Sequence, residues 1–485
     1  GDVYKRQAGN WSPGCAAGSG ASSPAALLWQ TRRRAMVDVV FTGGRVVDVR
    51  TCTSRIANVA VEHGKIVDIS AHELPAKRVV DAAGLVVAPG FIDVHGHLDG
   101  HAYAGQLSAM QGITTTVGGN CGLSPLDLEG WFAGQARTGY VINQAELVGH
   151  SFSMRRAVGI EDVNARASAA QTDAMVRIAD RALRAGAAGV SLGLDYAPGS
   201  GLAEIDAMAA IAAEYGRCLP VHTRLFTQND LYSLYEMLAA AKRSGGRLLL
   251  SHFVYQYSGF GTLRPALDVV DAARAKGMDV WMDSGMYTDW ATYAGTATFD
   301  EQTIKDNSLR FGDMVAATGK YTGTRLNREL YELLRHKYPD ESIICYSGEP
   351  YEIYEALQKP YAMMSTDAGA YAPGEGHPQI AGSYPRFLRK MVREKRLLGL
   401  EEAVYKCTLL PAQTYHIPGK GVLEPGYDAD LVLFDRDAVR DNAKMPDKGE
   451  PDAPPDGIPY VMVNGVFAVD DGVFQNTRSG SVIRY

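Results

Sequence analysis

The sequence predicts an α/β protein in which a (β/α)8 TIM-like barrel is joined to a small β-sandwich domain built from both chain ends. A central region alternates apolar, strand-like runs with helical patterns. Shorter β-like runs flank this region on both sides. The chain has 485 residues, of which 46% are hydrophobic, so it is long enough to bury a core of this size.

The small β domain is predicted from residues 37–88 together with residues 416–485. Short apolar runs such as 37–41 alternate with turn residues in the first segment, and the same pattern returns at residues 460–463. The dipeptide Asn464-Gly465 between two apolar runs indicates a two-residue β-hairpin. We therefore expect the two ends of the chain to meet in one β unit.

The barrel is predicted from residues 89–415. Eight apolar, β-branched runs mark its strands: 85–95, 114–121, 141–148, 187–192, 218–222, 248–252, 278–282 and 363–367. Helical patterns separate most of them, at 173–185, 202–215, 231–244 and 266–275. Strands that alternate with helices form parallel sheets with right-handed crossovers, and eight such units indicate a closed barrel.

A long segment, about residues 286–345, separates the seventh and eighth predicted strands. The loops that follow barrel strands lie on the catalytic face, so this insertion is expected to form a lid or a pocket wall near the active site. The alternative is a surface excursion that only aids association.

The first 35 residues differ in composition from the rest of the chain. They are rich in Gly, Ser and Ala and contain Arg32-Arg33-Arg34 after a weakly apolar stretch, which is the reverse of a secretory signal. Met36 stands directly before the first strand-like run. We expect residues 1–35 to be a disordered or non-native extension, with natural translation starting at Met36.

Composition excludes several classes of partner. A net charge of −7 and a pI near 5.9 argue against a nucleic-acid-binding face. No apolar run approaches the roughly 20 residues of a membrane helix. The six cysteines are scattered, with no spacing typical of a disulfide framework, which predicts reduced thiols and a cytoplasmic protein. Association into a homo-oligomer is left open.

Metal-binding residue types stand where the predicted strands end. Catalytic side chains of barrels lie at the C-terminal ends of strands. The residues that meet this condition are His95, His97, Cys121, His222, His252 and Asp367. Imidazole and thiolate are ligands that zinc prefers, and a catalytic zinc takes three protein ligands and a water. Any one of them alone could be core filler, Cys121 could be an inert buried thiol and Asp367 a helix cap, but six together predict a metal site.

Several motifs carry a resemblance to a known family. PGFIDVHGH at residues 89–97 resembles the opening motif of the amidohydrolase superfamily. GNCG at residues 119–122 resembles the metal-binding cysteine motif of its D-aminoacylase (N-acyl-D-amino-acid deacylase) branch. Further matches are GAAGVSLGLDYAPG at 186–199, HTR at 222–224, SH at 251–252, STD at 365–367, SYPR at 383–386, LPA at 410–412 and GVLEPGYDADL at 421–431.

The resemblance implies a zinc-dependent hydrolase that acts on the amide bond of a small N-acylated molecule. Cys121, His222 and His252 would hold one tight Zn²⁺. His95 and His97 would help to form a second, weaker metal position. Asp367, beside the metal, would be the general acid/base.

Substrate residues depart from the family pattern. Val254 and Gln379 stand where the family has cations that hold a substrate carboxylate, and Asp283 adds an acid at the seventh strand. Losing two charge-assisted bonds would weaken the binding of such a carboxylate by roughly one to four orders of magnitude.

Other side chains could contact a substrate instead. Arg224 and Arg386 are candidate anion partners, although Arg386 could be structural. Trp281, Tyr287, Trp290 and Tyr293 could line an aromatic pocket or pack in the core. Asp283 could bind a cationic or NH-rich group or be a solvated loop carboxylate, and Gln379 is a further candidate contact.

Two alternatives to the deacylase reading stay open. A cyclic amide hydrolase of the hydantoinase or dihydroorotase kind would need no free substrate carboxylate, which fits Val254 and Gln379. A non-catalytic scaffold with an amidohydrolase-like barrel is the other alternative, and it should have lost ligands that this chain keeps.

Overall fold

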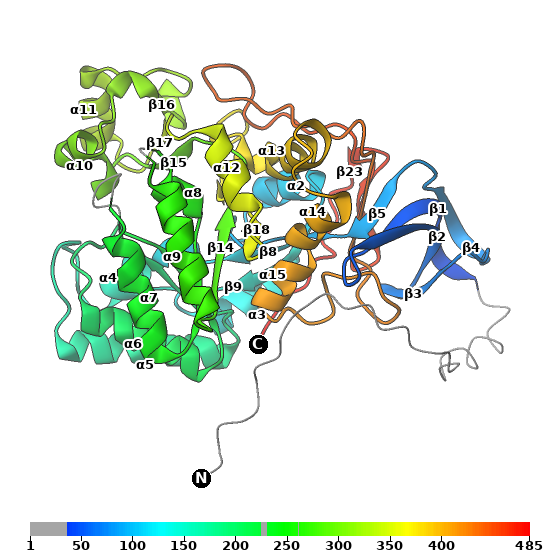
Figure 1. Cartoon of the computed structure of the whole chain (residues 1–485), viewed down its shortest axis with the longest axis horizontal. Coiled ribbons are helices and arrows are strands. Elements are labelled where there is room, and N and C mark those ends of the chain that lie inside the picture. The colour runs from blue at the N-terminus through cyan, green and yellow to red at the C-terminus, as the bar shows by residue number, and fades with distance from the viewer. Residues whose placement is uncertain (1–35, 225–229, 260) are drawn as a thin grey trace, which may run out of the picture.

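A computed structural model describes residues 36–224, 230–259 and 261–485. The fold is mixed α/β, with a β sheet at one side, a region of parallel strands and helices in the middle, and an α/β insertion above it (Figure 1). The expectation for residues 1–35 lies outside the described residues. Among the described residues, every helix is too short or too polar to cross a bilayer.

Both ends of the chain contribute to one nine-stranded sheet. Strand β5 joins the N-terminal and C-terminal parts of this sheet, because it pairs in parallel with β1 and antiparallel with β20. Phe41, Ile66 and Leu433 pack in a common core on this sheet. The strands are β1 (Val37–Asp48), β2 (Thr53–Glu62), β3 (Lys65–Ser70), β4 (Ala76–Asp81), β5 (Val86–Pro89), β20 (Leu431–Phe434), β21 (Tyr460–Val463), β22 (Val466–Asp470) and β23 (Val473–Phe474).

The predicted hairpin at Asn464-Gly465 is confirmed. It joins β21 to β22, which pair antiparallel. Both turn residues have positive φ, 49° and 83°, which is the conformation that a tight two-residue turn requires. Asparagine and glycine are the residues that adopt it at the lowest cost.

The central strands run parallel in three groups. β6 (Phe91–Asp93), β8 (Ile113–Gly118) and β9 (Asn143–Glu146) form the first. The second has the order β10 (Val148–Gly149), β11 (Val190–Gly193), β12 (Cys218–His222), β13 (Arg247–Leu250), β14 (Val280–Ser284) and β18 (Ala362–Met364). The third pairs β7 (Gly96–His97) with β19 (Ala368–Gly369). Each of the eight predicted runs overlaps at least one of these strands.

Helices separate the parallel strands, as the sequence pattern predicts. Two of them begin at a capping side chain, α3 at Asp127 and α5 at a Ser168–Gln171 capping box, and α5 ends at Gly186, whose φ is 108°. The helices are α2 (Ala102–Met110), α3 (Leu128–Thr138), α4 (Arg155–Ala157), α5 (Ala169–Ala185), α6 (Leu202–Glu214), α7 (Tyr232–Ser244), α8 (Phe253–Tyr257), α9 (Leu263–Ala275), α12 (Pro350–Leu357), α13 (Gln379–Phe387), α14 (Leu400–Cys407) and α15 (Leu409–Thr414).

The insertion between β14 and β18 is a small α/β unit with its own core. Its three strands form an antiparallel sheet in the order β15-β17-β16, and apolar side chains such as Phe299, Met314 and Ile343 pack beside it. The unit lies at the upper left of Figure 1. Its elements are β15 (Trp290–Tyr293), α10 (Glu301–Asp306), β16 (Met314–Ala316), α11 (Arg328–Lys337) and β17 (Ser342–Cys345).

Candidate metal centre

The six residues predicted to bind metal or catalyse the reaction lie together at the C-terminal ends of parallel strands. These residues form three groups of potential ligands. Within each group, the donor atoms lie within 4.8 Å of one another. The groups are His95, His97 and Cys121; Cys121, His222 and His252; and His95, His252 and Asp367. The rule that functional side chains follow barrel strands therefore located this cluster.

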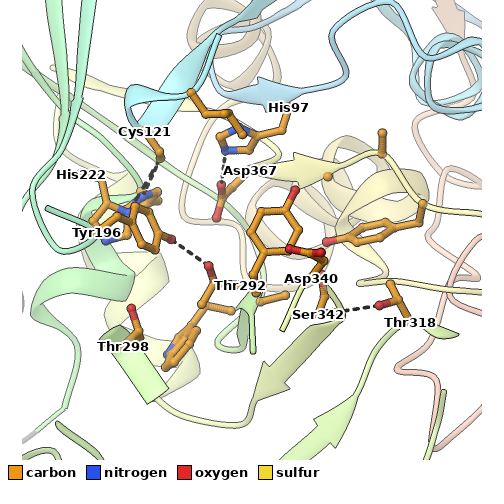
Figure 2. A pocket seen from close by; sticks show the side chains of 18 of the residues that line it. His97, Cys121, Tyr196, His222, Thr292, Thr298, Thr318, Asp340, Ser342 and Asp367 are labelled. Atoms are coloured by element: carbon orange, nitrogen blue, oxygen red, sulfur yellow. Dashed lines mark hydrogen bonds and ion pairs between the residues drawn. The ribbon is translucent and has the colours of Figure 1, made fainter. Parts of the chain in front are cut away.

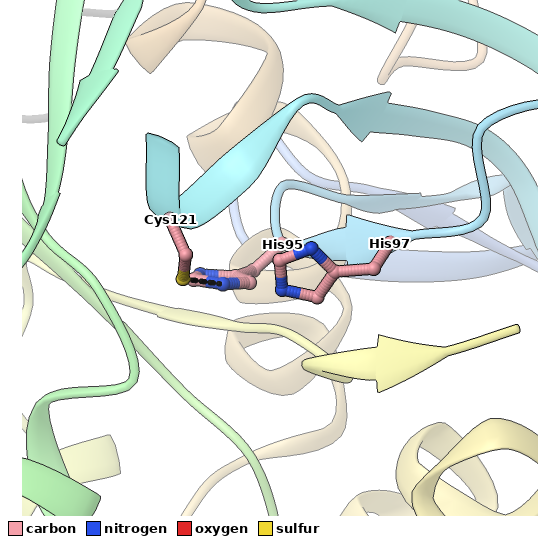
Figure 3. Close-up of side chains that lie close together, drawn as sticks. All are labelled: His95, His97 and Cys121. Atoms are coloured by element: carbon pink, nitrogen blue, oxygen red, sulfur yellow. Dashed lines mark hydrogen bonds between the residues drawn. The ribbon is translucent and has the colours of Figure 1, made fainter. Parts of the chain in front are cut away.

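Cys121 is at the centre of the cluster. Its Sγ lies 3.3 Å from His95 Nε2, 3.8 Å from His222 Nδ1 and 3.7 Å from His252 Nε2. A tetrahedral zinc with ordinary Zn–S and Zn–N bonds separates the sulfur from each nitrogen by about 3.5 Å. The donor set thus fits zinc in both ligand type and spacing, and Figure 3 shows Cys121 facing His95 with His97 beside it.

Asp367 contacts the same nitrogen of His95 that the sulfur contacts. Its Oδ1 is 3.4 Å from His95 Nε2 and 3.5 Å from His97 Nε2. Its backbone N–H donates to His95 O at 2.8 Å, and Gln379 donates to its carbonyl oxygen. The carboxylate is thereby held beside the imidazoles and faces the pocket (Figure 2).

Three of these residues adopt backbone conformations that L-amino acids rarely take. The φ angles of Cys121, His252 and Asp367 are 53°, 34° and 55°. Such conformations persist where the surroundings fix them, and they occur often at functional sites. Gly193 on β11 is one such constraint, because a side chain there would collide with the carbonyl oxygen of Cys121.

The neighbouring imidazoles favour the thiolate form of Cys121. Burial raises the pKa of Cys121, but the charge of His95 and hydrogen bonds from His222 and His252 bring it well below its ordinary value. Burial lowers the pKa of His97, but Asp367 and Cys121 raise it to about 10. The sulfur is thus already in the form that binds metal.

A second layer of polar side chains holds the histidines. Asp283 Oδ2 lies 3.5 Å from His95 Nδ1, and Gln256 Nε2 lies 3.1 Å from His222 Nε2. Asp195 Oδ2 lies 3.8 Å from His222 Nε2 and accepts a hydrogen bond from Thr298. Neither Asp195 nor Gln256 was predicted as a site residue, although Asp195 follows the end of β11, which was the available signal.

A pocket of about 540 Å³ opens over the cluster. Parallel-strand loops supply one side, including His97, Cys121 and Asp367, and the insertion supplies the other (Figure 2). Trp290 and Tyr293 line it, as the aromatic-pocket prediction expects. The insertion therefore forms a pocket wall.

None of the six predicted substrate contacts lines the described wall of this pocket. Arg224 is buried, and its guanidinium donates hydrogen bonds to Glu236 and to the backbone carbonyls of Pro198 and Ser200. Asp283 contacts His95 and His252, and Gln379 contacts the backbone of Asp367. Both therefore touch the candidate ligands without lining the pocket. Trp281 donates a hydrogen bond to Asp279, and Arg386 forms an ion pair with Asp441. The guanidinium of Arg386 also lies over the ring of Tyr287, so these two residues contact each other.

Candidate ligands at the ends of parallel strands, with a pocket above them, are typical of an α/β protein with a zinc site. The sequence matches the model of the amidohydrolase family over residues 86–467. N-acyl-D-glutamate deacylase of Alcaligenes xylosoxydans xylosoxydans is 32% identical, over 92% of this chain and 96% of that protein. The chain therefore belongs to the amidohydrolase family and is similar to its D-aminoacylase branch.

Solved structures give the same result. An N-acyl-D-glutamate deacylase from Bordetella bronchiseptica, in complex with zinc and a phosphonate mimic of the tetrahedral intermediate, has a TM-score of 0.80 and 30% identity, covering 93% of this chain and all of that one. A D-aminoacylase studied for its binuclear metal centre has a TM-score of 0.82 and 27% identity, with the same coverage. L-Hydantoinase from Arthrobacter aurescens, at 19% identity and a TM-score of 0.61, shares the fold alone.

Proposed function

We propose that this chain is a zinc-dependent amidohydrolase that cleaves the amide bond of an N-acyl-D-amino acid or a related N-acylated small molecule. The observation that carries the proposal is the position of Cys121 Sγ, 3.3–3.8 Å from three imidazole nitrogens at the base of a pocket. The similarity to deacylases over more than nine-tenths of the chain supports the reaction.

Cys121, His222 and His252 would hold the tight zinc, and His95 and His97 would share Cys121 in a second, weaker metal position. Cys121 belongs to both ligand groups, so its sulfur would be available to either position. Zinc bound here would lower the pKa of a water molecule and polarise the amide carbonyl.

We infer that Asp367 is the group that moves protons. Burial raises its pKa, but the neighbouring histidines, His97 first, bring the pKa below its ordinary value, so the carboxylate is available as a base. It would take a proton from the attacking water and deliver it to the leaving nitrogen, which must be protonated to depart.

The finer architecture is part of the same proposal. We infer that the parallel groups form one closed (β/α)8 barrel over residues 89–415. Only the buried Leu147 separates β9 from β10, and β7 and β19 continue the paths of β6 and β18 and pair with each other. Residues 37–88 and 416–485 would be the small β domain, folded around its own core as a sandwich.

The alternatives have less support. The hydantoinase likeness is distant, and every candidate ligand is in place, which disfavours a scaffold without catalysis. A cytoplasmic location is supported by the free thiols of the five described cysteines.

Zinc content and amine release test the proposal. The wild-type protein should contain about one tight equivalent of zinc and release amine from N-acyl-D- rather than N-acyl-L-amino acids. Cys121→Ala should lose zinc and more than about 100-fold in activity, beyond the loss typical of outer-shell changes.

Cys218→Ala is the matched control, because Cys218 is also buried and lies on β12, which ends at His222, but is not in any ligand group. Full zinc in Cys121→Ala would contradict the ligand assignment. Hydrolysis of cyclic amides alone would move the substrate class to the hydantoinase alternative.

A further inference from the structure

The pocket above the metal site is lined by acids without matching bases. Among its described lining residues none is Lys or Arg, and residues 225–229 and 260 contain neither in the sequence. Six carboxylate side chains line it: Asp99, Asp195, Asp340, Glu341, Asp367 and Glu375. The histidines and a bound metal can balance the negative charge of the acids at the base of the pocket. The acids at its mouth have no such counter-charge.

Three of the acids are supplied by the far wall. Asp340 and Glu341 come from the end of the insertion, and Glu375 comes from the loop after β19. Glu341 accepts a hydrogen bond from Thr318, and Glu375 accepts one from the N–H of Gly319 at 3.0 Å. None of the three makes an ion pair with a described Lys or Arg, and Asp340 has no polar partner among the described residues.

Ser342 provides an independent sign that a ligand belongs here. It follows Glu341 and lines the pocket although only 6% of it is exposed. Its hydroxyl has no hydrogen-bond partner among the residues that the structure describes. A hydroxyl of a pocket-lining residue that has no protein partner is free to bond a polar group of a ligand or a water molecule.

The rings beside these acids can also contact a cation. Trp290, Tyr293 and Tyr371 line the same pocket, and aromatic faces attract ammonium and guanidinium groups. Figure 2 shows Asp340, Ser342 and Thr318 across the pocket from Cys121 and His222. A substrate whose amide reaches the metal site would therefore extend its remote end toward the acids.

We propose that the pocket selects N-acylated substrates that carry a guanidinium or ammonium group remote from the scissile amide, with Asp340 and Glu375 as specificity-determining residues. This inference rests on the proposed function and names its substrate class. An acidic remote group would meet like charges with no cation to offset them, and such repulsion discriminates between ligands as strongly as attraction does.

The test compares N-acetyl-D-arginine with N-acetyl-D-citrulline, which has nearly the same shape without the charge, and with N-acetyl-D-glutamate. In the zinc-loaded enzyme, kcat/KM for the arginine compound should exceed that for the citrulline compound by about tenfold or more, as one charge-assisted contact allows. The glutamate compound should be the poorest of the three.

The double variant Asp340→Asn/Glu375→Gln should bring the arginine-to-citrulline ratio close to one. Glu329→Gln is the matched control, because Glu329 lies on α11 of the same insertion but does not line the pocket, and it should leave the ratio unchanged. Zinc content should stay at the wild-type level in both.

The outcomes separate this inference from the proposed function. A wild-type ratio at or below one, or a ratio unchanged in the double variant, would overturn the cation preference while amide hydrolysis stands. If no N-acyl-D-amino acid is hydrolysed, the proposed function fails. Calorimetric binding of D-arginine against D-citrulline to the zinc-loaded protein then still tests the charge preference, and equal affinities would overturn it.

Discussion

At the scale of single residues, Asp283 shows how one buried carboxylate can organise a metal site. It has no exposed surface, its Oδ1 accepts from the N–H of His252 at 3.0 Å and from the hydroxyl of Ser365 at 2.7 Å, and its Oδ2 faces His95. One side chain on β14 therefore contacts two candidate ligands, His252 after β13 and His95 after β6. Outer carboxylates of this kind hold a ligating imidazole in one orientation and tautomer.

We predict that Asp283→Asn weakens zinc binding by about 10–100-fold, because the amide loses the charge that orients His95. Competition with a chromophoric zinc chelator measures this affinity. Asp279→Asn is the control, since Asp279 lies at the opposite end of the same strand region and pairs with Arg247 at 2.9 Å. Equal zinc affinity of the two variants would rule out the positioning role.

The sequence predicted the cluster of candidate metal ligands but not the residues around it. His95, Cys121 and Asp367 could be found because a strand end determines where a side chain points in a barrel. Asp283 was predicted to contact substrate, but it faces the histidines from behind, and residue type and position alone do not tell these two sides apart. Asp340 and Glu375 were missed because they reach the pocket only through the folding of long loops.

At the scale of elements, the insertion combines its own core with a wall of the active-site pocket. Phe299 is fully buried in that core and stacks on Trp290 with ring centroids 5.5 Å apart, and Trp290 lines the pocket. The carbonyl of Phe299 accepts a hydrogen bond from Tyr331 at 2.6 Å, which ties the segment to α11. Packing inside the insertion therefore sets the position of the wall.

Phe299→Ala should destabilise the insertion locally by about 3–5 kcal/mol, the usual cost of deleting a buried aromatic ring. Because the candidate metal ligands lie on other elements, we expect KM to rise while zinc content is unchanged. Hydrogen exchange should increase within residues 290–345 and stay constant in the parallel strands. Phe41→Ala, in the core of the nine-stranded sheet, should not raise exchange in the insertion, and if it did, the two cores would not be independent.

The parallel strands were predictable and the strands of the insertion were not. Runs such as 218–222, which is β12, are apolar up to the terminal His222 because both faces of a parallel strand are buried. In the insertion, β16 has three residues and none of the four residues of β15 is fully buried, so neither shows a periodic pattern. Their pairing depends on contacts within the insertion that no short window of sequence contains.

At the scale of the whole molecule, contacts between distant segments hold the chain together. β5 joins β1 to β20, and Gln144 on β9 exchanges backbone hydrogen bonds with Ser481 and Ile483 near the chain end, at 2.9 and 2.7 Å. Both flanking segments alternate short apolar runs with turn residues, and this shared pattern predicted the first of these contacts. The second involves a short terminal segment without a strand-like pattern, and it was not predicted.

A buried charge cluster links the stability of the whole molecule to pH. Glu204 on α6 accepts from Arg155 at 2.6 Å and contacts His150 at 2.8 Å, and all three side chains are almost completely buried. Burial raises the pKa of Glu204, but His150 and Arg155 lower it to about 2, from an ordinary value of 4.5. A carboxyl with a depressed pKa stabilises the folded state fully above about pH 4.5, and that stability is lost as the pH falls toward 2.

We predict that Glu204→Gln unfolds more easily than the wild type at pH 6, because Arg155 is left buried without its counter-charge. The difference in free energy of unfolding should then shrink by about 3 kcal/mol between pH 5 and pH 2, since only the wild type has this carboxylate to protonate. Urea denaturation at a series of pH values measures both quantities. Glu214→Gln, at the exposed end of the same helix, should track the wild type throughout, and a constant difference for Glu204→Gln would mean that Glu204 is not the acid-sensitive group.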